Sequence, residues 1–372
     1  MEDPMSTRHE ANRRDFLTGR AALEAIRGLA DHGESPPPKS PLELDREANT
    51  PSFLVEISRP AMAVEFQIFL NAGQPPLGPE VALQALDLVD ALEDQLSVYR
   101  EHSEVSQINR RASLEPIAVE PRLFGLLQQS LTIYAATAGA FDITSGPLSK
   151  VWGFFRRQGR FPQEADIREA LERVGSQWLA LDCERATVQF LKPGIEINFH
   201  AIGKGYTLDR AAELLRQTGV EDYLIHGGQS SILASGSRAG ASEDRRGWWV
   251  ALRHPLRSEQ QLGEIRLQNR ALGTSGSGVQ FFYHQGRRFG HILDPRTGWP
   301  SEGVLSATVL APTAAEADAL ATAFTIWEPE QTAEFCRQRE DVAAILVCPG
   351  ERAGSLSLHT LGVSDTDWRV RL

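Results

Sequence analysis

From Pro51 to the end of the chain, segments with helical spacing of apolar residues are mixed with segments that alternate like strands. The expected helices are Pro79–Tyr99, Arg122–Ala138, Asp166–Val174, Gly205–Gln217, Ala314–Ile326 and Pro329–Arg339. The expected strands are Ala61–Leu70, Leu179–Leu191, Ile195–Phe199, the hairpin Tyr223–Ser235, Trp248–His254, Leu262–Gln268, Val279–His284, Ser306–Leu310 and Val342–Val347. Because these elements follow no strict strand–helix–strand order, the sequence predicts an α+β fold with mostly antiparallel sheets. No repeat or second linker interrupts this region, so we expect one domain over residues 51–372.

Residues 1–50 are polar and are broken by Ser35-Pro36-Pro37-Pro38 and Pro41. Such a segment buries too little apolar surface to offset chain entropy, so we expect a flexible leader. Arg13-Arg14-Asp15-Phe16-Leu17 resembles the start of a twin-arginine export signal, but charged residues interrupt the apolar stretch that should follow. A degenerate signal and a cytoplasmic protein are therefore favoured, and export to the periplasmic side of the membrane is the alternative. No apolar run is long enough to predict a transmembrane helix.

The 372 residues carry a net charge of −11, and 41 % of them are apolar. This composition is normal for a soluble globular protein, and the negative charge argues against general binding to nucleic acid or an anionic membrane. An acidic protein that binds a phosphate ligand needs local help from a cation, a helix N-terminus or a metal ion. The cysteines Cys183, Cys336 and Cys348 are too few and too scattered for a disulfide framework or a CxxC metal site.

The most informative helix is Thr313–Trp327. Thr313 and Glu316 fit a capping box, which places the start of this helix. Asp318 and Thr322 are four residues apart, so they share one helix face among small or apolar neighbours. A carboxylate and a hydroxyl are hard oxygen ligands that suit Mg²⁺. The alternative is a buried aspartate that is satisfied by internal hydrogen bonds.

The segment Gly290–Pro300 combines histidine, acidic, basic, glycine and proline residues between two expected strands. Loops in which proline and glycine hold titratable groups are common places for function. His291 can act as a general base near neutral pH. The alternative is a structured turn in which Asp294 and Arg296 satisfy the backbone.

Four further segments give weaker signals. They are Tyr99–Asn109, Gly139–Leu148, Ile197–Tyr206 and Ala271–Gly276. Ile197–Tyr206 leads from an expected strand into a helix, whose N-terminal amides can bind an anion. Gly139–Leu148 and Ala271–Gly276 are rich in small residues, which let a ligand approach the backbone. Taken singly, three of these segments are more simply explained as tight turns, and Tyr99–Asn109 as a surface loop.

Taken in order, these segments resemble the ApbE family from about Met62 to beyond Thr322. Ser97-Val98-Tyr99 through Asn109 resembles its S-x-Y…S-E-x-S-x-x-N element, and Gly139–Leu148 resembles G-x-F-D-x-T-x-G-P-L. Ile202–Asp209 is similar to I-A-K-G-Y-x-x-D, His226-Gly227-Gly228 to a later glycine pair, and Gly273–Gly276 to A-T-S-G. His291–Gly298 matches H-I-L-D-P-R-T-G in full, and Ala317–Ala323 matches A-D-A-L-A-T-A in full.

The resemblance implies a single α+β unit of the T-fold kind that binds FAD and Mg²⁺. It implies transfer of FMN from FAD to a Ser or Thr hydroxyl of an acceptor flavoprotein in a redox or electron-transport system, with release of AMP. The residues at the metal positions are Asp318, Thr322 and Ala201, the last through its backbone oxygen. The residues at FAD-contacting positions are Met62, Tyr99, Ala140, Phe141, Asp142, Asn198, Lys204 and Ile292. His291 occupies the position of the base for the acceptor hydroxyl.

Three residues depart from the family pattern. Asn198 stands where Asp is usual, His200 where a small Gly or Ser is usual, and Gln229 where an acidic residue is common. Exchange of a carboxylate for an amide removes a charge and adds hydrogen-bond donors, so the change at Asn198 bears on FAD binding more than on metal binding. The alternatives to an active transferase are a relative that hydrolyses FAD to FMN and AMP, and a flavin-binding module without turnover.

Overall fold

The computed structural model describes residues 53–74, 78–278, 280–352 and 354–371, which belong to one compact unit, Leu44–Leu372. The helices are α3 (Gly78–Leu96), α4 (Glu104–Arg111), α5 (Pro121–Ala136), α6 (Gly146–Val151), α7 (Glu164–Leu171), α8 (Gly203–Gln217), α9 (Ala314–Ile326) and α10 (Pro329–Gln338), with short 3-10 turns η1 (Phe154–Arg156), η2 (Ser176–Trp178) and η3 (Glu243–Arg245). None of the helices in these described ranges is both long enough and apolar enough to cross a bilayer. The predicted leader and its twin-arginine-like segment lie outside the described residues.

The strands form one large sheet and three small ones. They are β1 (Leu54–Ala61), β2 (Val64–Asn71), β3 (Ile117–Ala118), β4 (Leu179–Asp182), β5 (Thr187–Phe190), β6 (Tyr223–Gly227), β7 (Ser231–Ser235), β8 (Trp248–His254), β9 (Arg257–Leu267), β10 (Arg270–Gly276), β11 (Phe281–His284), β12 (Arg287–Gly290), β13 (Ser306–Ala311), β14 (Ala343–Pro349), β15 (Leu356–Leu361) and β16 (Trp368–Val370). The large sheet has the order β1-β2-β6-β7-β10-β13-β14-β15, and every neighbouring pair in it is antiparallel. The small sheets are β3-β5-β4, β16-β9-β8 and β11-β12. The predicted α+β class with mostly antiparallel sheets is therefore confirmed.

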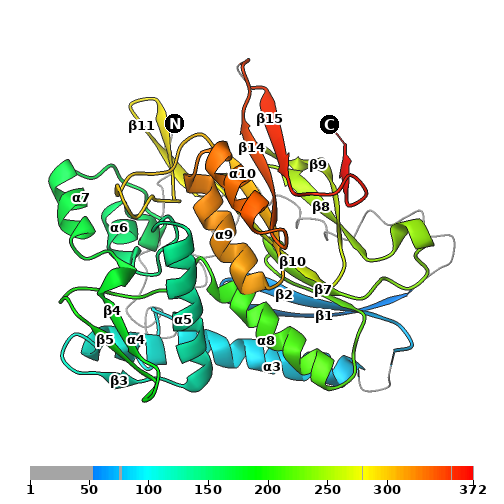
Figure 1. Ribbon diagram of the computed structural model, residues 1–372, viewed down its shortest axis with the longest axis horizontal. Coiled ribbons are helices and arrows are strands. Elements are labelled where there is room, and N and C mark those ends of the chain that lie inside the picture. The colour runs from blue at the N-terminus through cyan, green and yellow to red at the C-terminus, as the bar shows by residue number, and fades with distance from the viewer. Residues whose placement is uncertain (1–52, 75–77, 279, 353, 372) are drawn as a thin grey trace, which may run out of the picture. The chain divides into compact units, whose positions relative to one another are not determined.

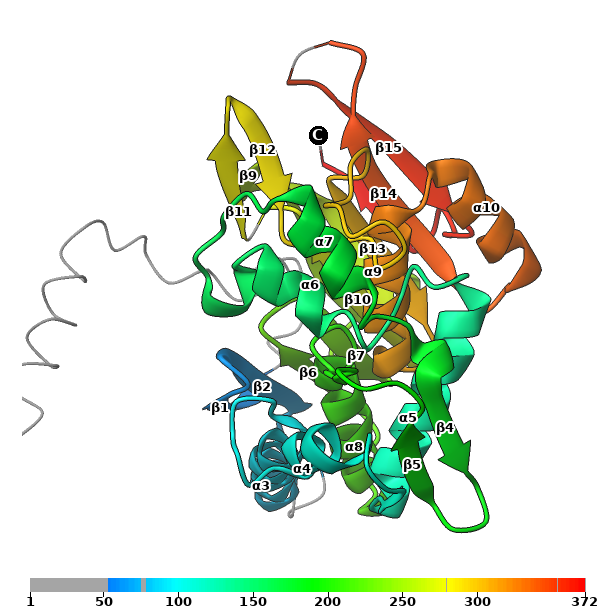
Figure 2. The ribbon, with the colours of Figure 1, turned by 90° about the vertical axis from the view of Figure 1, so that its left-hand side faces the viewer.

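Helices α3, α8 and α9 lie against one face of the large sheet (Figures 1 and 2). α9 packs on β10 and β13, while α8 packs on β6, β7 and both of the other helices. The main hydrophobic core fills the space between these layers, with fully buried side chains such as Phe66, Tyr223 and Phe324. Burial of this apolar surface is the main force that holds helices and sheet together. The arrangement brings the N-terminal turn of α8 and the first half of α9 over the middle of the sheet.

Two predicted strands are corrected by the structure. Ala61–Leu70 was expected as one strand, but the chain turns at Met62 and Ala63, which have φ of 50° and 60°. A two-residue hairpin turn with positive φ matches the twist of the flanking strands but usually uses Asn or Gly, so this sequence carried no turn signal. Ile195–Phe199 forms no strand with any other part of the described chain. The side chain of Asn109 bonds both the N–H and the carbonyl of Ile197, and the N–H of Asn198 donates to the carbonyl of Ile143.

A further correction concerns Tyr99–Asn109, for which a surface loop was the simpler expectation. Its second half forms α4, which buries Val105 and Ile108. The Ser103 hydroxyl caps this helix by accepting the N–H of Ser106 at 3.0 Å. The apolar stripe was only two residues long, which is too short to be distinguished from a loop by periodicity.

His226 of β6 is a buried histidine in the core. It is 1 % exposed, and neither ring nitrogen has a hydrogen-bond partner among the described residues. The ring of Phe69 lies 5.8 Å from it, and burial lowers the pKa of His226 from 6.5 to about 4. The imidazole is therefore neutral in the folded protein throughout the physiological pH range.

We expect His226 to make the folded protein sensitive to acid. Between pH 6.5 and 4 the unfolded chain binds a proton that the folded chain rejects, so this histidine lowers the free energy of unfolding as the pH falls, by about 2 kcal/mol at pH 5. Urea unfolding of the native protein and of His226→Leu at pH 7.5 and pH 5 tests this. The variant should gain about 2 kcal/mol relative to the native protein on acidification, since all other titrating groups are shared. If the free energies of unfolding of the two proteins differed by the same amount at both pH values, the lowered pKa of His226 would be contradicted.

Candidate active site

Asp318 lies in the second turn of α9 and is only 8 % exposed. Its Oδ2 accepts hydrogen bonds from the backbone N–H of Gly205 and from the hydroxyl of Ser231, both at 2.8 Å. Its Oδ1 accepts none from the part of the chain that the structure describes. Burial raises the pKa of this carboxyl, and the nearby ammonium of Lys204 opposes that rise. A cation at Oδ1, like the ammonium of Lys204, would compensate the charge of this buried carboxylate.

Two glycines allow the backbone to approach Asp318 this closely. A Cβ on Gly205 of α8 would overlap the carbonyl oxygen of Ala314, and a Cβ on Gly273 of β10 would lie 2.5 Å from that of Ala317. One turn further along α8, Asp209 accepts the N–H groups of Ala314 and Ala315 at 2.8 and 2.9 Å. These contacts fix the start of α9 against α8. They bring the N-terminal turn of α8 and the middle of β10 close to Asp318.

The other predicted metal ligands lie on these same elements. The hydroxyl of Thr322 is 3.1 Å from that of Ser275 on β10, and Ala201 directly precedes Ile202, the N-cap of α8. No group of three His, Cys, Asp or Glu residues that could hold a metal gathers within the described ranges. Mg²⁺, however, is commonly held by one or two carboxylates and completes its shell with water and substrate phosphates. The free Oδ1 of Asp318 and the neighbouring hydroxyls therefore fit Mg²⁺ in that mode.

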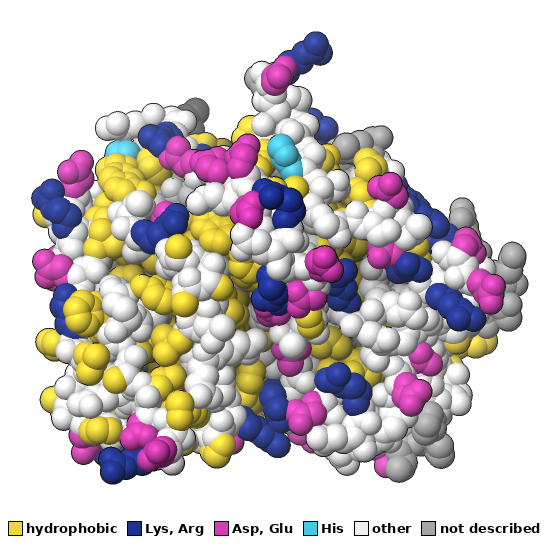
Figure 3. Space-filling view, in the orientation of Figure 1, with side chains coloured by type: hydrophobic (Ala, Val, Ile, Leu, Met, Phe, Trp, Pro, Cys, Tyr) yellow, Lys and Arg dark blue, Asp and Glu magenta, His cyan; other side chains and the backbone are white. Residues whose placement is uncertain are grey.

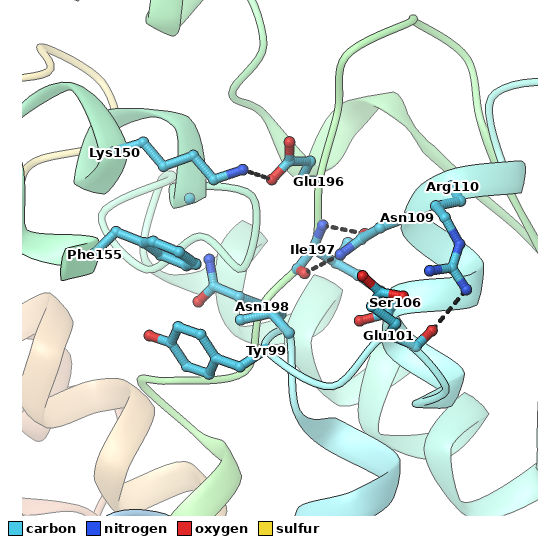
Figure 4. A pocket seen from close by; sticks show the side chains of 12 residues that line it. Tyr99, Glu101, Ser106, Asn109, Arg110, Lys150, Phe155, Glu196, Ile197 and Asn198 are labelled. Carbon is cyan, nitrogen blue, oxygen red and sulfur yellow. Dashed lines mark hydrogen bonds and ion pairs between the residues drawn. The ribbon is translucent and has the colours of Figure 1, made fainter. Parts of the chain in front are cut away.

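A pocket of about 230 Å³ opens between the end of α3, α4, α6 and residues 196–198 (Figure 4). The rings of Tyr99 and Phe155 lie at one end of it, with centroids 4.9 Å apart, and the amide of Asn198 extends toward the space between them. Lys150 and Glu196 form an ion pair along its rim. The volume is below the roughly 300 to 1,000 Å³ of common ligand pockets, so it suits part of a dinucleotide. The structure thus brings together two of the predicted FAD contacts, Tyr99 and Asn198.

The chain runs directly from this pocket into α8. The carbonyl of Phe199 accepts the N–H groups of Ile202 and Gly203 at 3.1 and 2.6 Å, which turns the backbone into the helix. The N-cap Ile202 makes no side-chain cap, and the Nζ of Lys204 donates to the hydroxyl of Ser230 at 2.9 Å. A helix N-terminus with a lysine in its first turn attracts phosphate groups. The first turn of α8, which follows the pocket along the chain and contacts Asp318, can therefore hold an anion.

His291 follows β12 and is partly buried. Its Nδ1 lies 3.2 Å from the carbonyl of Gln280, which also accepts the backbone N–H of His291 at 3.1 Å. If Nδ1 carries the proton in that bond, Nε2 is left with a free lone pair. Burial lowers the pKa of His291 below its usual 6.5, and the bond to Gln280 opposes this more weakly. The ring is therefore neutral at pH 7 and can accept a proton.

A second, aromatic core holds the loop after His291. Trp152 is fully buried among Phe154, Phe282 and Phe289, and its Nε1 donates to the carbonyl of Gly298 at 2.8 Å. Part of this core reaches the surface, where hydrophobic side chains gather between α7 and the β11–β12 hairpin (Figure 3). Within the loop, Asp294 accepts the backbone N–H of Arg296 at 2.9 Å, as the structured-turn alternative expected. The guanidinium of Arg296 pairs with the same carboxylate at 2.8 Å rather than with the backbone. These contacts hold the loop, and His291 stands at its beginning.

Strand β10 connects the Asp318 region with His291. Ser275 contacts Thr322, and two residues later the Cβ of Ser277 lies 3.2 Å from where a Cβ on Gly290 would stand. Two residues of extended chain span about 7 Å. The carbonyl of Ser277 also accepts Arg288 of β12 at 2.6 Å. The metal ligands proposed at Thr322 and Asp318 therefore adjoin β10, and the hairpin that precedes His291 adjoins the turn directly after this strand.

Most of the remaining predicted FAD contacts are buried. Ala140 and Phe141 are 1 % exposed and Ile292 is 7 % exposed, while Met62 lies in the β1–β2 turn near Thr207. The carboxylate of Asp142 is occupied internally by the N–H and hydroxyl groups of Thr144 and Ser176. Burial raises its pKa, and these four hydrogen bonds oppose the rise. Asp142 stays a predicted FAD contact, and here it also ties two loops together.

Sequence reasoning did not single out three residues that build the site. Ser231 orients Asp318, Asn109 clamps the backbone at Ile197, and Phe155 pairs with Tyr99. Asn109 ends the polar stretch that was noted, so its motif was a usable signal. Ser231 begins the short strand β7, 87 residues from its partner, and nothing local marked it.

The chain is similar in sequence to proteins of known activity. The model of the ApbE family matches residues 62–346. A protein of Klebsiella pneumoniae (strain 342) named FAD:protein FMN transferase is 33 % identical over 270 residues, which is 72 % of this chain and 82 % of that protein. The FAD:protein FMN transferase of Escherichia coli (strain K12) is 33 % identical over 266 residues, which is 70 % of this chain and 74 % of that protein.

Solved structures give the same result. The ApbE protein of Thermotoga maritima superposes with a TM-score of 0.73 at 26 % identity and covers 82 % of this chain and 96 % of its own. The flavin transferase ApbE of Vibrio cholerae superposes with a TM-score of 0.72 at 26 % identity and covers 84 % and 98 %. The likeness thus spans the fold and nearly the whole length of both solved proteins.

Proposed function

Because this chain belongs to the ApbE family, we propose that it transfers FMN from FAD to a Ser or Thr hydroxyl of an acceptor protein and releases AMP. One observation carries the proposal. The Tyr99–Asn198 pocket is followed directly along the chain by the N-terminus of α8, where the N–H of Gly205 bonds Asp318. Residues 275–277 contact Thr322 on one side and the glycine that precedes His291 on the other. This order of groups suits a long substrate with a planar ring at one end and a pyrophosphate in its middle.

Each of these groups has a role in the proposal. The flavin ring enters the pocket beside Tyr99 and Phe155, whose aromatic faces favour stacking with a planar group. The pyrophosphate lies at the N-terminus of α8 near Lys204, where the helix dipole and the ammonium group attract its charge. Asp318, Thr322 and the carbonyl of Ala201 would hold Mg²⁺, and the ion would supply neutralisation and alignment of the phosphates.

The acceptor hydroxyl is activated by His291. The oxygen of the acceptor hydroxyl attacks the phosphorus of the FMN half of FAD, while Nε2 of His291 takes the hydroxyl proton. The bond between that phosphorus and the bridging oxygen breaks, and AMP leaves with the bridging oxygen. The products are a phosphoester-linked FMN on the acceptor and free AMP, so all atoms are accounted for.

Incubation with FAD, Mg²⁺ and a candidate acceptor tests the proposal. The acceptor should carry a Ser/Thr-Gly-Ala-Ser/Thr segment, and its mass is measured before and after. We expect a gain equal to FMN minus water, matched by one AMP per acceptor, and no gain when the target hydroxyl residue is replaced by alanine. AMP release that is equally fast without the acceptor, and without covalent flavin, would instead establish FAD hydrolysis.

A further inference from the structure

The ring of Tyr99 stands at the mouth of the pocket on a firmly held piece of backbone. Its own N–H donates to the hydroxyl of Ser97 at 3.2 Å, and the hydroxyl of Ser103 donates to the carbonyl of Ser97 at 2.5 Å. The Tyr99 ring, by contrast, is 61 % exposed. An exposed ring on a fixed backbone still chooses between rotamers, so other groups must set its orientation.

Two rings flank this tyrosine. Phe155 lies with its centroid 4.9 Å away at 31°, and His200 lies 5.7 Å away with the two planes only 14° apart. The near-parallel contact with His200 is the geometry of an offset stack. His200 is itself outside the set of residues that line the pocket. Its imidazole therefore influences the pocket through its contact with the Tyr99 ring.

The backbone that carries His200 is also fixed. Asn109 clamps Ile197 from both sides, and Phe199 begins the turn into α8. The position of the imidazole is thus set by the same segment that leads to the helix N-terminus.

We propose that His200 is a positioning residue, whose imidazole stacks on Tyr99 and holds that ring in the orientation in which a flat ligand ring can stack at the pocket. The inference rests on the proposed function, because the flat group it concerns is the flavin of FAD. It assigns a role to a residue that departs from the family pattern. Holding the ring in advance removes an ordering cost from binding, so FAD affinity in this chain depends on an aromatic group at position 200.

FAD binding without acceptor or Mg²⁺ provides the test, measured by quenching of flavin fluorescence. His200→Ala should raise the Kd for FAD by about 3- to 10-fold, the range expected for loss of one aromatic pair. His200→Phe should restore binding to within about twofold, since it keeps a flat ring. The matched control is His102→Ala, which removes an exposed histidine three residues after Tyr99 and should leave the Kd unchanged. Melting temperatures confirm that all variants are folded.

A double-mutant cycle with Tyr99→Ala separates this role from a general structural one. If His200 acts through Tyr99, His200→Ala should add nothing to the loss already caused by Tyr99→Ala. An equal loss in both backgrounds, or an unchanged Kd in the native background, would overturn the inference while FAD binding itself supports the proposed function. A protein that binds no FAD at all would contradict both.

Discussion

Replacement of Asp318 by asparagine should lower the rate of FMN transfer by about 1,000-fold while the protein stays folded. Asparagine keeps the shape of the side chain and an oxygen that can accept the N–H of Gly205, which the carboxylate bonds at 2.8 Å. It removes the negative charge that Mg²⁺ requires from its protein ligand. A metal ion that neutralises transferring phosphates stabilises the transition state by several kcal/mol, which corresponds to about three orders of magnitude in rate.

The control for this variant lies on the same helix. Glu316→Gln removes one negative charge from the first turn of α9, where Glu316 pairs with Arg339 at 2.9 Å. It should leave the rate and its Mg²⁺ dependence within about twofold of the native values. Initial rates across a Mg²⁺ titration, with melting temperatures for both variants, provide the measurement. If Asp318→Asn kept native turnover and Mg²⁺ dependence, Asp318 would be a structural aspartate held by Gly205 and Ser231.

The start of α9 was predictable from the sequence because its signals are local. The hydroxyl of Thr313 accepts the N–H of Glu316 at 3.2 Å, as the capping pattern expected. The reciprocal half of the box is replaced, since the Glu316 carboxylate turns to Arg339. The i, i+4 spacing also placed Asp318 and Thr322 on one face, and the carbonyl of Asp318 indeed accepts the Thr322 hydroxyl at 3.3 Å.

Other parts of the site depend on contacts between distant residues, which no local pattern encodes. Ser231 and Asp318 are 87 residues apart, and Asn109 and Ile197 are 88 apart. The same reason explains the error at Ile195–Phe199, where a side chain takes the place of a neighbouring strand. The turn at Met62 and Ala63 was missed because residues with a Cβ adopt positive φ there, and only the surrounding hairpin can impose that conformation.

The second large effect is expected at His291. Removal of its imidazole in His291→Ala should lower the rate of covalent FMN transfer by about 100- to 1,000-fold, the usual contribution of a general base. The Kd for FAD should change by less than about threefold, because the ring acts on the acceptor hydroxyl rather than on FAD. Rates come from in-gel flavin fluorescence over time, and the Kd comes from a separate titration. Loss of binding and of transfer in equal proportion would assign His291 to ligand binding instead.

The dependence of the FMN transfer rate on pH gives an independent test of the role of His291. The neutral ring is the active form, and burial lowers the pKa of His291 below 6.5, so the acid limb of the native rate profile should fall below pH 6.5. That limb should be absent from the residual activity of His291→Ala. The matched control is His284→Ala, which removes an imidazole from β11 of the same hairpin, where it stacks on Phe161 at 4.3 Å. Because His284 stacks on that phenylalanine, we give it no role in proton transfer. The His284→Ala variant should therefore keep both the native rate and the acid limb of the profile. This control distinguishes loss of the general base from a change in the hairpin.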